Sequence, residues 1–165
     1  MHAALAVMNI GKSEILALII GQLRRDLASL EQAIARDTAT HSDCLGSSKY
    51  ETMGLEASYL AQGQGTRLLE IERGLEYYKR LTLPEPSSVV RLSSLVVLDD
   101  DEGNRQLLWL ASEAGGLKVQ CNDLIITVIT PRSPLGKVLI GKGEGESFEI
   151  NIAGTSRSYE LSSLY

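Results

Sequence analysis

Apolar residues in the first half of the chain recur at alternating steps of four and three. One series comprises Leu16, Ile20, Leu23, Leu27, Leu30 and Ile34, and a second comprises Ala57, Ala61, Gln64, Leu68, Ile71, Leu75 and Tyr78. This spacing is the a/d pattern of a coiled-coil seam, with Gln64 as its polar interruption. It predicts two amphipathic helices within residues 13–82, joined by a polar turn and packed as an antiparallel hairpin.

The ends of this predicted hairpin carry helix start and stop signals. Ser13 is a suitable N-cap with Glu14 behind it, and Pro84 and Pro86 close the second helix. At about 1.5 Å per residue, arms of about 25 to 30 residues are on the order of 40 Å long, which favours a projecting finger over a compact core. Gly63 and Gly65 each cost about 1 kcal/mol in a helix interior and predict a kink or a close helix approach.

The second half of the chain changes to short β-type runs after a Pro/Ser-rich linker at residues 83–88. Expected strands are residues 89–98, 105–112, 117–121, 124–130, 147–152 and 156–161. Ser133 and Pro134 predict the start of a short helix that Gly141 ends in a left-handed conformation. The predicted fold class is therefore α+β: a helical hairpin, preceded by an extension over residues 1–12, and a small antiparallel sheet domain with one short helix over residues 89–165.

Composition narrows the range of functions. The 165 residues carry a net charge of −5, and no clustered basic face is apparent, which makes direct binding of nucleic acid a secondary possibility. Only Cys44 and Cys121 are present, which favours a reducing, cytoplasmic setting. The apolar start of the chain is too short to span a bilayer, and the apolar residues near 15–20 are absorbed by the heptad pattern, so we expect no membrane segment.

Three local patterns suggest chemistry that their context does not support. The acidic run at residues 99–104 lacks the longer loop with a terminal glutamate that an EF-hand requires, so we expect a solvated hairpin turn. Gly141, Gly143 and Gly145 are followed by no helix that would present amides to a phosphate. His41 and Cys44 have no partner in the sequence that would orient them for nucleophilic catalysis.

The segment ITVITPRSPLGKVLIGK at residues 126–142, followed by Gly145, Glu146 and an apolar strand at residues 148–150, resembles the C-terminal domain of the GreA/GreB transcription elongation factors. A helical hairpin of matching length precedes it, as in that family. The resemblance implies an FKBP-like second domain that docks on bacterial RNA polymerase. It also implies a finger that enters the secondary channel, where tip carboxylates help to hold a second Mg²⁺ for cleavage of backtracked RNA.

The resemblance also implies site residues. The polymerase-binding segment falls on Ser133, Pro134, Leu135, Gly136 and Lys137. At the finger tip, aligning the motif tyrosine with Tyr50 places the family's aspartate on Asp43, the candidate metal ligand. The metal-holding glutamate then falls on Gly46, and a second acid falls on Lys49. Because a lone monodentate ligand is a poor substitute for a pair, we expect weak or no stimulation of cleavage.

The leading hypothesis is an RNA polymerase-binding regulator, itself not an enzyme, that acts through the secondary channel as an elongated monomer. It contacts nucleic acid only indirectly within the elongation complex and holds no cofactor of its own beyond Mg²⁺ shared with the polymerase. Competing hypotheses are a Rnk-like or anti-cleavage competitor of Gre factors, an FKBP-type prolyl isomerase, and a plain coiled-coil interaction module. The isomerase is disfavoured because Trp109, Phe148, Tyr159 and Tyr165 are not clustered in the sequence.

Overall fold

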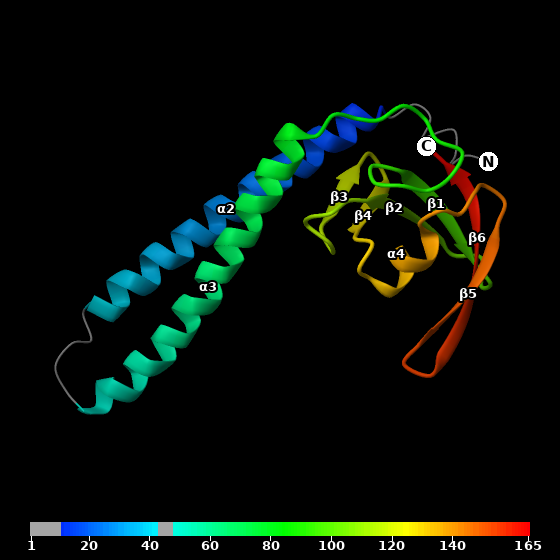
Figure 1. Cartoon of the computed structure of the whole chain (residues 1–165). Helices are drawn as coiled ribbons and strands as arrows, with labels where there is room; N and C mark the ends of the chain where they lie inside the picture. Colours follow the sequence, from blue (N-terminus) through cyan, green and yellow to red (C-terminus); the bar gives the residue numbers. More distant parts are fainter. Residues whose placement is uncertain (1–10, 43–47) are drawn as a thin grey trace. The chain divides into compact units, whose positions relative to one another are not determined.

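A computed structural model (Figure 1) describes the backbone of residues 11–42 and 48–165, and the side-chain surroundings of residues 11–37 and 62–165. Its long helices are α2 (Lys12–Ser42) and α3 (Ser48–Arg80). The remaining elements are β1 (Leu95–Asp100), β2 (Arg105–Leu110), β3 (Lys118–Cys121), β4 (Leu124–Ile129), α4 (Pro134–Leu139), β5 (Ser147–Ile152) and β6 (Thr155–Leu164). The described part of the chain is therefore α+β, with long helices first and a sheet domain after them.

The chain divides into two compact units. One unit contains the start of α2, up to Ile19, together with residues 80–165, and the other is Ile20–Lys79. The division expected from the sequence, a hairpin over residues 13–82 and a domain over 89–165, differs from this grouping in the first turns of α2 and at residues 80–82. Those turns belong with the sheet.

Within the unit Ile20–Lys79, α2 and α3 run in opposite directions (Figure 1). The predicted seam positions Leu23, Ile71 and Leu75 are buried. Farther along both helices, Leu27, Leu30, Ile34 and Leu68 are only half-buried. The apolar stripe is therefore confirmed, but it is fully shielded from solvent only near the start of α2 and the end of α3.

In the first turns of α2 the buried face lies one residue away from the predicted stripe. Ile15 and Ile19 are completely buried, whereas Leu16 and Ile20 are half-buried. These turns lie in the same unit as the sheet, where the Lys12 ammonium sits 5.4 Å from the centre of the Trp109 ring. Lys12, Ile15 and Ile19 share one face of the helix because of their spacing. This face of α2 is therefore the one that lies toward the sheet.

The polar interruption of the second stripe has a partner on the opposite helix. Gln64 Nε2 donates to Asp37 Oδ2 at 2.6 Å. A polar pair at a seam position stabilises less than an apolar one but favours a single alignment of the two helices. We infer that this hydrogen bond helps to fix the register of α2 against α3.

The sheet is mixed, which corrects the prediction of an antiparallel one. Its strand order is β3-β4-β2-β1-β6-β5, and β2 pairs with β4 in parallel, while every other pair is antiparallel. The chain reverses direction between β2 and β3 and again between β3 and β4, so β4 runs the same way as β2. The placement of β4 between β3 and β2 then makes that pair parallel.

The six expected strands are all present, but the first is shorter than predicted. It begins at Leu95, not at residue 89, because Ser93 has a left-handed backbone with φ of 72° that turns the chain just before β1. Val89 instead forms an isolated bridge with Gly143. At the other end of the sheet, β6 extends to Leu164, beyond the predicted end at residue 161.

The central strands are apolar on both faces. Val96, Leu98, Leu108 and Leu110 point into a core completed by Leu139 of α4 and Leu161 of β6. On the opposite face, Trp109 is paired in register with Leu95 on β1 and with Val128 on β4, and all three are buried. Such a sheet must be covered on both sides.

Among the described helices, none combines the length and the apolar content needed to cross a bilayer.

The expected close helix approach at Gly63 and Gly65 is wrong. A Cβ at either position would meet nothing within 4 Å, and α3 is continuous through both. Gly63→Ala should therefore stabilise the protein by about 0.4–1 kcal/mol, because it reduces the freedom of the unfolded chain and adds no clash. Thermal unfolding should show a melting temperature raised by about 1–4 °C.

Gly103→Ala is the matched control. Gly103 also has open space around it, but its φ is +84°, so an alanine there is strained by about 1 kcal/mol. A melting temperature that falls for Gly63→Ala as it does for Gly103→Ala would contradict the unstrained helical geometry described for α3.

Candidate functional site

The segment that resembles the polymerase-binding motif forms a capped turn and the short helix α4. Ser133 has an extended backbone and its Oγ accepts from the Gly136 amide at 3.1 Å, while the same hydroxyl donates to the Thr130 carbonyl at 2.8 Å. Pro134 occupies the first turn, and Gly141 has φ of +87° just beyond the helix. The predicted N-cap at Ser133 and the predicted glycine stop at Gly141 are both confirmed, whereas the N-cap predicted at Ser13 is wrong, because α2 begins at Lys12 and the Glu14 amide donates to the Gly11 carbonyl.

Gly136 is required by a close approach of the backbone. A Cβ at this position would lie 2.0 Å from the Thr130 carbonyl oxygen and 2.9 Å from Ser133 Oγ. No side chain fits there while the cap remains intact. Gly136 is therefore needed for the backbone conformation of this segment, and contacts with a partner protein can come only from the residues beside it.

The segment between the linker and β1 is hydrogen-bonded through Val90 to the loop that follows α4. The Val90 amide donates to the Lys142 carbonyl at 2.8 Å, and the Gly141 amide donates to the Val90 carbonyl at 2.9 Å. Val90 itself is buried in the core beside Leu139. These contacts fix α4 from both of its ends, through the Ser133 cap and through Val90.

The five predicted contact residues divide by exposure. Pro134 and Lys137 are exposed, Ser133 and Leu135 are half-buried, and Gly136 is buried. Leu135 packs against the same core as Leu139. A partner that meets this segment would therefore touch mainly the proline ring and the lysine ammonium, held in place by the other three residues.

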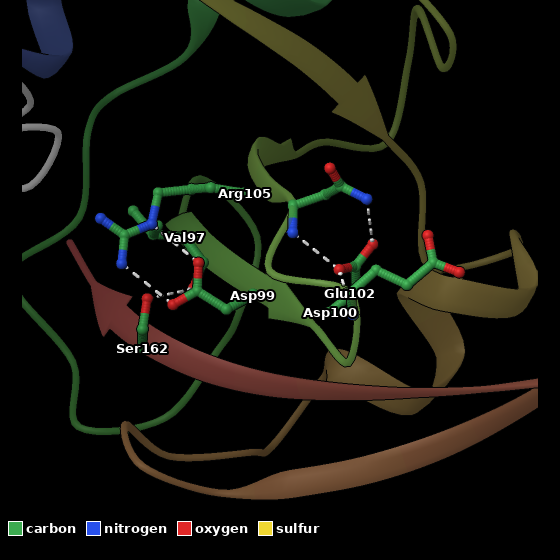
Figure 2. A network of polar contacts seen from close by, with 7 residues as sticks. Val97, Asp99, Asp100, Glu102, Arg105 and Ser162 are labelled. Atoms are coloured by element: carbon green, nitrogen blue, oxygen red, sulfur yellow. Dashed lines mark hydrogen bonds and ion pairs between the residues drawn. The ribbon is translucent and has the colours of Figure 1, made fainter.

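The acidic run at residues 99–104, which begins in the last two residues of β1, forms the expected hairpin turn (Figure 2). Asp100 Oδ1 accepts from the Asn104 amide at 2.7 Å and from the Glu102 amide at 2.9 Å, and Asn104 Nδ2 donates to Asp100 Oδ2 at 3.1 Å. The pKa of the Asp100 carboxyl is lowered, chiefly by the Asn104 backbone amide. Its oxygens are occupied by the turn, and no group of three or more potential metal ligands occurs among the described residues.

Asp99 and Arg105 form a two-pronged ion pair beside this turn. Arg105 Nε lies 2.7 Å from Asp99 Oδ1, and its terminal nitrogen lies 2.9 Å from Oδ2. Figure 2 shows the guanidinium facing the carboxylate. The two residues face each other across β1 and β2. The Arg105 hydrogen bonds are the main reason why the pKa of the Asp99 carboxyl lies below its usual value, with burial acting in the opposite direction.

Lys12, at the start of α2, makes contacts with the sheet domain that the sequence did not reveal. Its ammonium lies over the Trp109 ring and donates to the Tyr165 carbonyl at 3.4 Å. Its pKa is lowered, first by burial and second by the nearby Arg91. Attraction between an ammonium and an indole face is strongest when water is excluded, so this contact ties the start of α2 to the sheet.

Asp43, the candidate metal ligand, and Gly46, where the family's metal-holding glutamate falls, lie outside the described residues. The helices on either side of them are 31 and 33 residues long, or about 46–50 Å at the α-helical rise. The proposed tip chemistry therefore depends on the sequence alone.

The described fold defines an α+β protein in which a long helical pair precedes a mixed sheet with a capped helix. No family model matches the chain. Curated relatives named transcription elongation factor GreA, from Brucella canis and Brucella suis, are 53% identical to it over 72 residues, which is 44% of this chain and 42% of each relative. The match thus spans less than half the length of these relatives. The resemblance to the Gre factors is confirmed over that stretch.

A solved structure of GreA factor homolog 1 from Thermus thermophilus aligns with 90% of this chain and 95% of its own, at 21% identity and a TM-score of 0.37. A TM-score this low does not establish a common fold. The sequence identity to GreA, not this alignment, supports the resemblance.

The close approach at Gly136 predicts a large effect of a small substitution. Gly136→Ala should destabilise the protein by about 1–3 kcal/mol, because the new methyl group must displace either the Thr130 carbonyl or the Ser133 hydroxyl. Urea unfolding measures this difference. Lys137→Ala, at the next and exposed position, should change stability by less than about 0.5 kcal/mol. Equal stabilities of the two variants would contradict the capped geometry.

The Asp99–Arg105 pair predicts a dependence of stability on pH. The carboxyl has a lowered folded-state pKa, so its contribution is present above the unfolded-state value of about 3.9 and is lost as the pH falls through the folded-state value. Asp99→Asn should therefore cost about 1 kcal/mol at pH 7 and less at pH 3.

Urea unfolding of wild type and Asp99→Asn at both pH values tests this prediction. Asp123→Asn, an exposed position in the β3–β4 turn, is the control for loss of a carboxylate. A cost of Asp99→Asn that is the same at pH 3 as at pH 7 would show that the ion pair does not contribute.

Proposed function

We propose that this protein is a Gre-type factor that binds bacterial RNA polymerase and regulates transcription elongation. The observation that carries the proposal is the 53% identity over 72 residues to proteins named transcription elongation factor GreA. The capped segment with exposed Pro134 and Lys137 supports it, because that segment lies where the resemblance places the polymerase contact. The sheet domain, which we propose is FKBP-like, would anchor the protein on the polymerase.

In this proposal the two long helices reach into the secondary channel. Helices of about 46–50 Å have the length needed to span a channel on the scale of a protein domain. The unit Ile20–Lys79 carries more acidic than basic side chains, so it would occupy the channel by fit against protein walls and not by neutralising phosphates. Contact with nucleic acid would then be indirect, within the elongation complex.

The tip sequence favours modulation with weak or no RNA cleavage. A second Mg²⁺ in a two-metal phosphoryl reaction needs several oxygen ligands, and Asp43 is the one acidic residue retained from the motif. Gly46 stands where the motif has its metal-holding glutamate, so one carboxylate is missing. Lys49 stands where the motif has a second acid, so a positive charge replaces another carboxylate. We propose that any Mg²⁺ at Asp43 is shared with the polymerase active site, and that the protein competes with cleavage-stimulating Gre factors.

A prolyl isomerase and a plain coiled-coil module have weaker support. Trp109 is fully buried and Phe148 stacks on Tyr159 at 5.7 Å within the domain, so Trp109 and Phe148 are used in packing and do not provide the aromatic-lined pocket of an isomerase. A coiled-coil module that dimerises through its seam would sediment as a stable dimer. The Gre-type proposal expects an elongated monomer in the same measurement.

The test mixes the full chain with core RNA polymerase carrying a backtracked transcript. We expect co-migration with the polymerase at micromolar concentration and little added RNA cleavage. In the presence of a GreA protein, RNA cleavage should be slower with this protein than with GreA alone. Failure to bind would refute the proposal.

A substitution at the tip separates a channel occupant from a protein bound elsewhere. Gly46→Glu restores the missing carboxylate and should increase RNA cleavage by about tenfold or more, the size expected when a metal ligand is regained. Gly46→Gln supplies a side chain of equal size without the charge and should give no increase. Equal cleavage by both variants would place the tip away from the catalytic metals.

A further inference from the structure

The hairpin of β5 and β6 has two unlike faces. Pairing in register places Phe148 opposite Tyr159, Ile150 opposite Arg157 and Ile152 opposite Thr155. Because side chains alternate along a strand, these three pairs lie on one face. The other face is polar, and on it Ser158 Oγ donates to Glu149 Oε1 at 3.3 Å. The hairpin thus continues an apolar surface outward from the core.

The helix that covers this surface is too short to cover all of it. α4 has six residues, about 9 Å of helix, whereas β6 has ten residues, about 33 Å of strand. Exposure follows this mismatch: Tyr159 is 8% exposed and Ile150 6%, but Ile152 is 50% exposed. Figure 1 shows the outer end of the hairpin extending past α4.

A hollow of about 310 Å³ lies on the uncovered part of this face. Its lining residues are Ile150, Ile152, Thr155, Arg157 and Tyr159. Tyr159 and Ile150 contribute largely buried side chains, and Ile152, Thr155 and Arg157 contribute exposed ones. The hollow has room for one bulky apolar side chain of a partner.

The polar part of the lining is positive. Arg157 is exposed and forms no ion pair with another residue in the described part of the chain. The lowered pKa of Asp100 is due first to the Asn104 backbone amide and only last to the charge of Arg157, and the Asp100 carboxylate is already held by the Asn104 and Glu102 amides. At the inner end, the Lys142 ammonium lies 5.7 Å from the Phe148 ring. The open face therefore combines apolar groups with an available guanidinium, which favours a partner that carries a carboxylate next to an apolar group.

We propose that this hollow docks a segment of RNA polymerase that presents a bulky apolar side chain beside a carboxylate. The apolar side chain would fill the space above Tyr159 and Ile150, and the carboxylate would pair with Arg157. This inference rests on the proposed function and adds a second contact to the one at Pro134 and Lys137. A few central residues carry most of the binding energy at such interfaces, so substitutions in the hollow should have large effects.

The test measures the affinity of the full chain for core RNA polymerase. Arg157→Glu and Ile152→Ser should each weaken binding by about tenfold or more, because the first reverses the pairing charge and the second removes apolar contact. Arg157→Lys, which keeps the charge, should retain most of the affinity. Thermal unfolding of each variant verifies that these exposed changes leave the fold intact.

The chain offers matched controls on other strands. Lys118→Glu makes the same change of charge on β3, at the opposite edge of the sheet, and Ile125→Ser removes an isoleucine that is 57% exposed on β4. Both should alter the affinity by less than about twofold, as expected for surface positions outside an interface.

The outcomes separate the inference from the proposed function. If wild type binds and the hollow variants bind as well as the controls do, the hollow is not a docking site and the Gre-type function still stands. If wild type fails to bind, both are refuted. If sedimentation shows a wild-type dimer that Arg157→Glu or Ile152→Ser converts to monomer, the occupant is a second copy of the chain, and docking of polymerase there is refuted.

Discussion

The structure depends on covering both faces of the central strands. β1 and β2 place apolar side chains alternately on each side, and Val96, Val97, Trp109 and Leu110 are almost completely shielded from solvent. Burial of one such side chain is worth about 1.5–3 kcal/mol, so leaving either face open would remove much of the stability of a small domain. α4 covers one face, with the Ser133 cap and the Val90 contacts holding it there. The first turns of α2 contribute to the other.

One helix therefore takes part in both units. Lys12, Ile15 and Ile19 belong to the unit that contains the sheet, and Leu23 begins the buried part of the seam in the unit Ile20–Lys79. The apolar positions 15, 19 and 23 are spaced by four residues, and the later ones at 27, 30 and 34 follow the coiled-coil spacing. The buried face of α2 thus moves from positions 15 and 19 in one unit to the seam that continues from Leu23 in the other, while the apolar seam series itself runs unbroken from Leu16 to Ile34.

Local sequence signals predicted the features that depend on few residues. Ser133, Pro134 and Gly141 identified α4 and its ends, because caps and turns are fixed by the chemistry of single side chains. The strand positions followed from short β-type runs bounded by turn residues, and the resemblance to the GreA/GreB factors followed from the segment that contains α4. The parallel pairing of β2 with β4 was not predictable, because a short apolar run indicates a strand buried on both faces but not the direction of its neighbour. The buried face of the first turns of α2 was also not predictable. Leu16 and Ile20 fit a coiled-coil seam as well as Ile15 and Ile19 do, and only the packing of α2 on the sheet decides between them.

The candidate site shows the same division between local and distant information. Sequence resemblance selected five consecutive residues at α4, but only tertiary structure separates exposed Pro134 and Lys137 from Gly136, whose role is to permit the approach of Thr130. The hollow beside Arg157 has no motif, because it arises from a difference in length between α4 and the β5–β6 hairpin. Binding surfaces of this kind are a consequence of incomplete cover. The short helix that completes the core on one side of Ile150 leaves Ile152 and Arg157 available on the other, so the packing requirement and the recognition surface have a common origin.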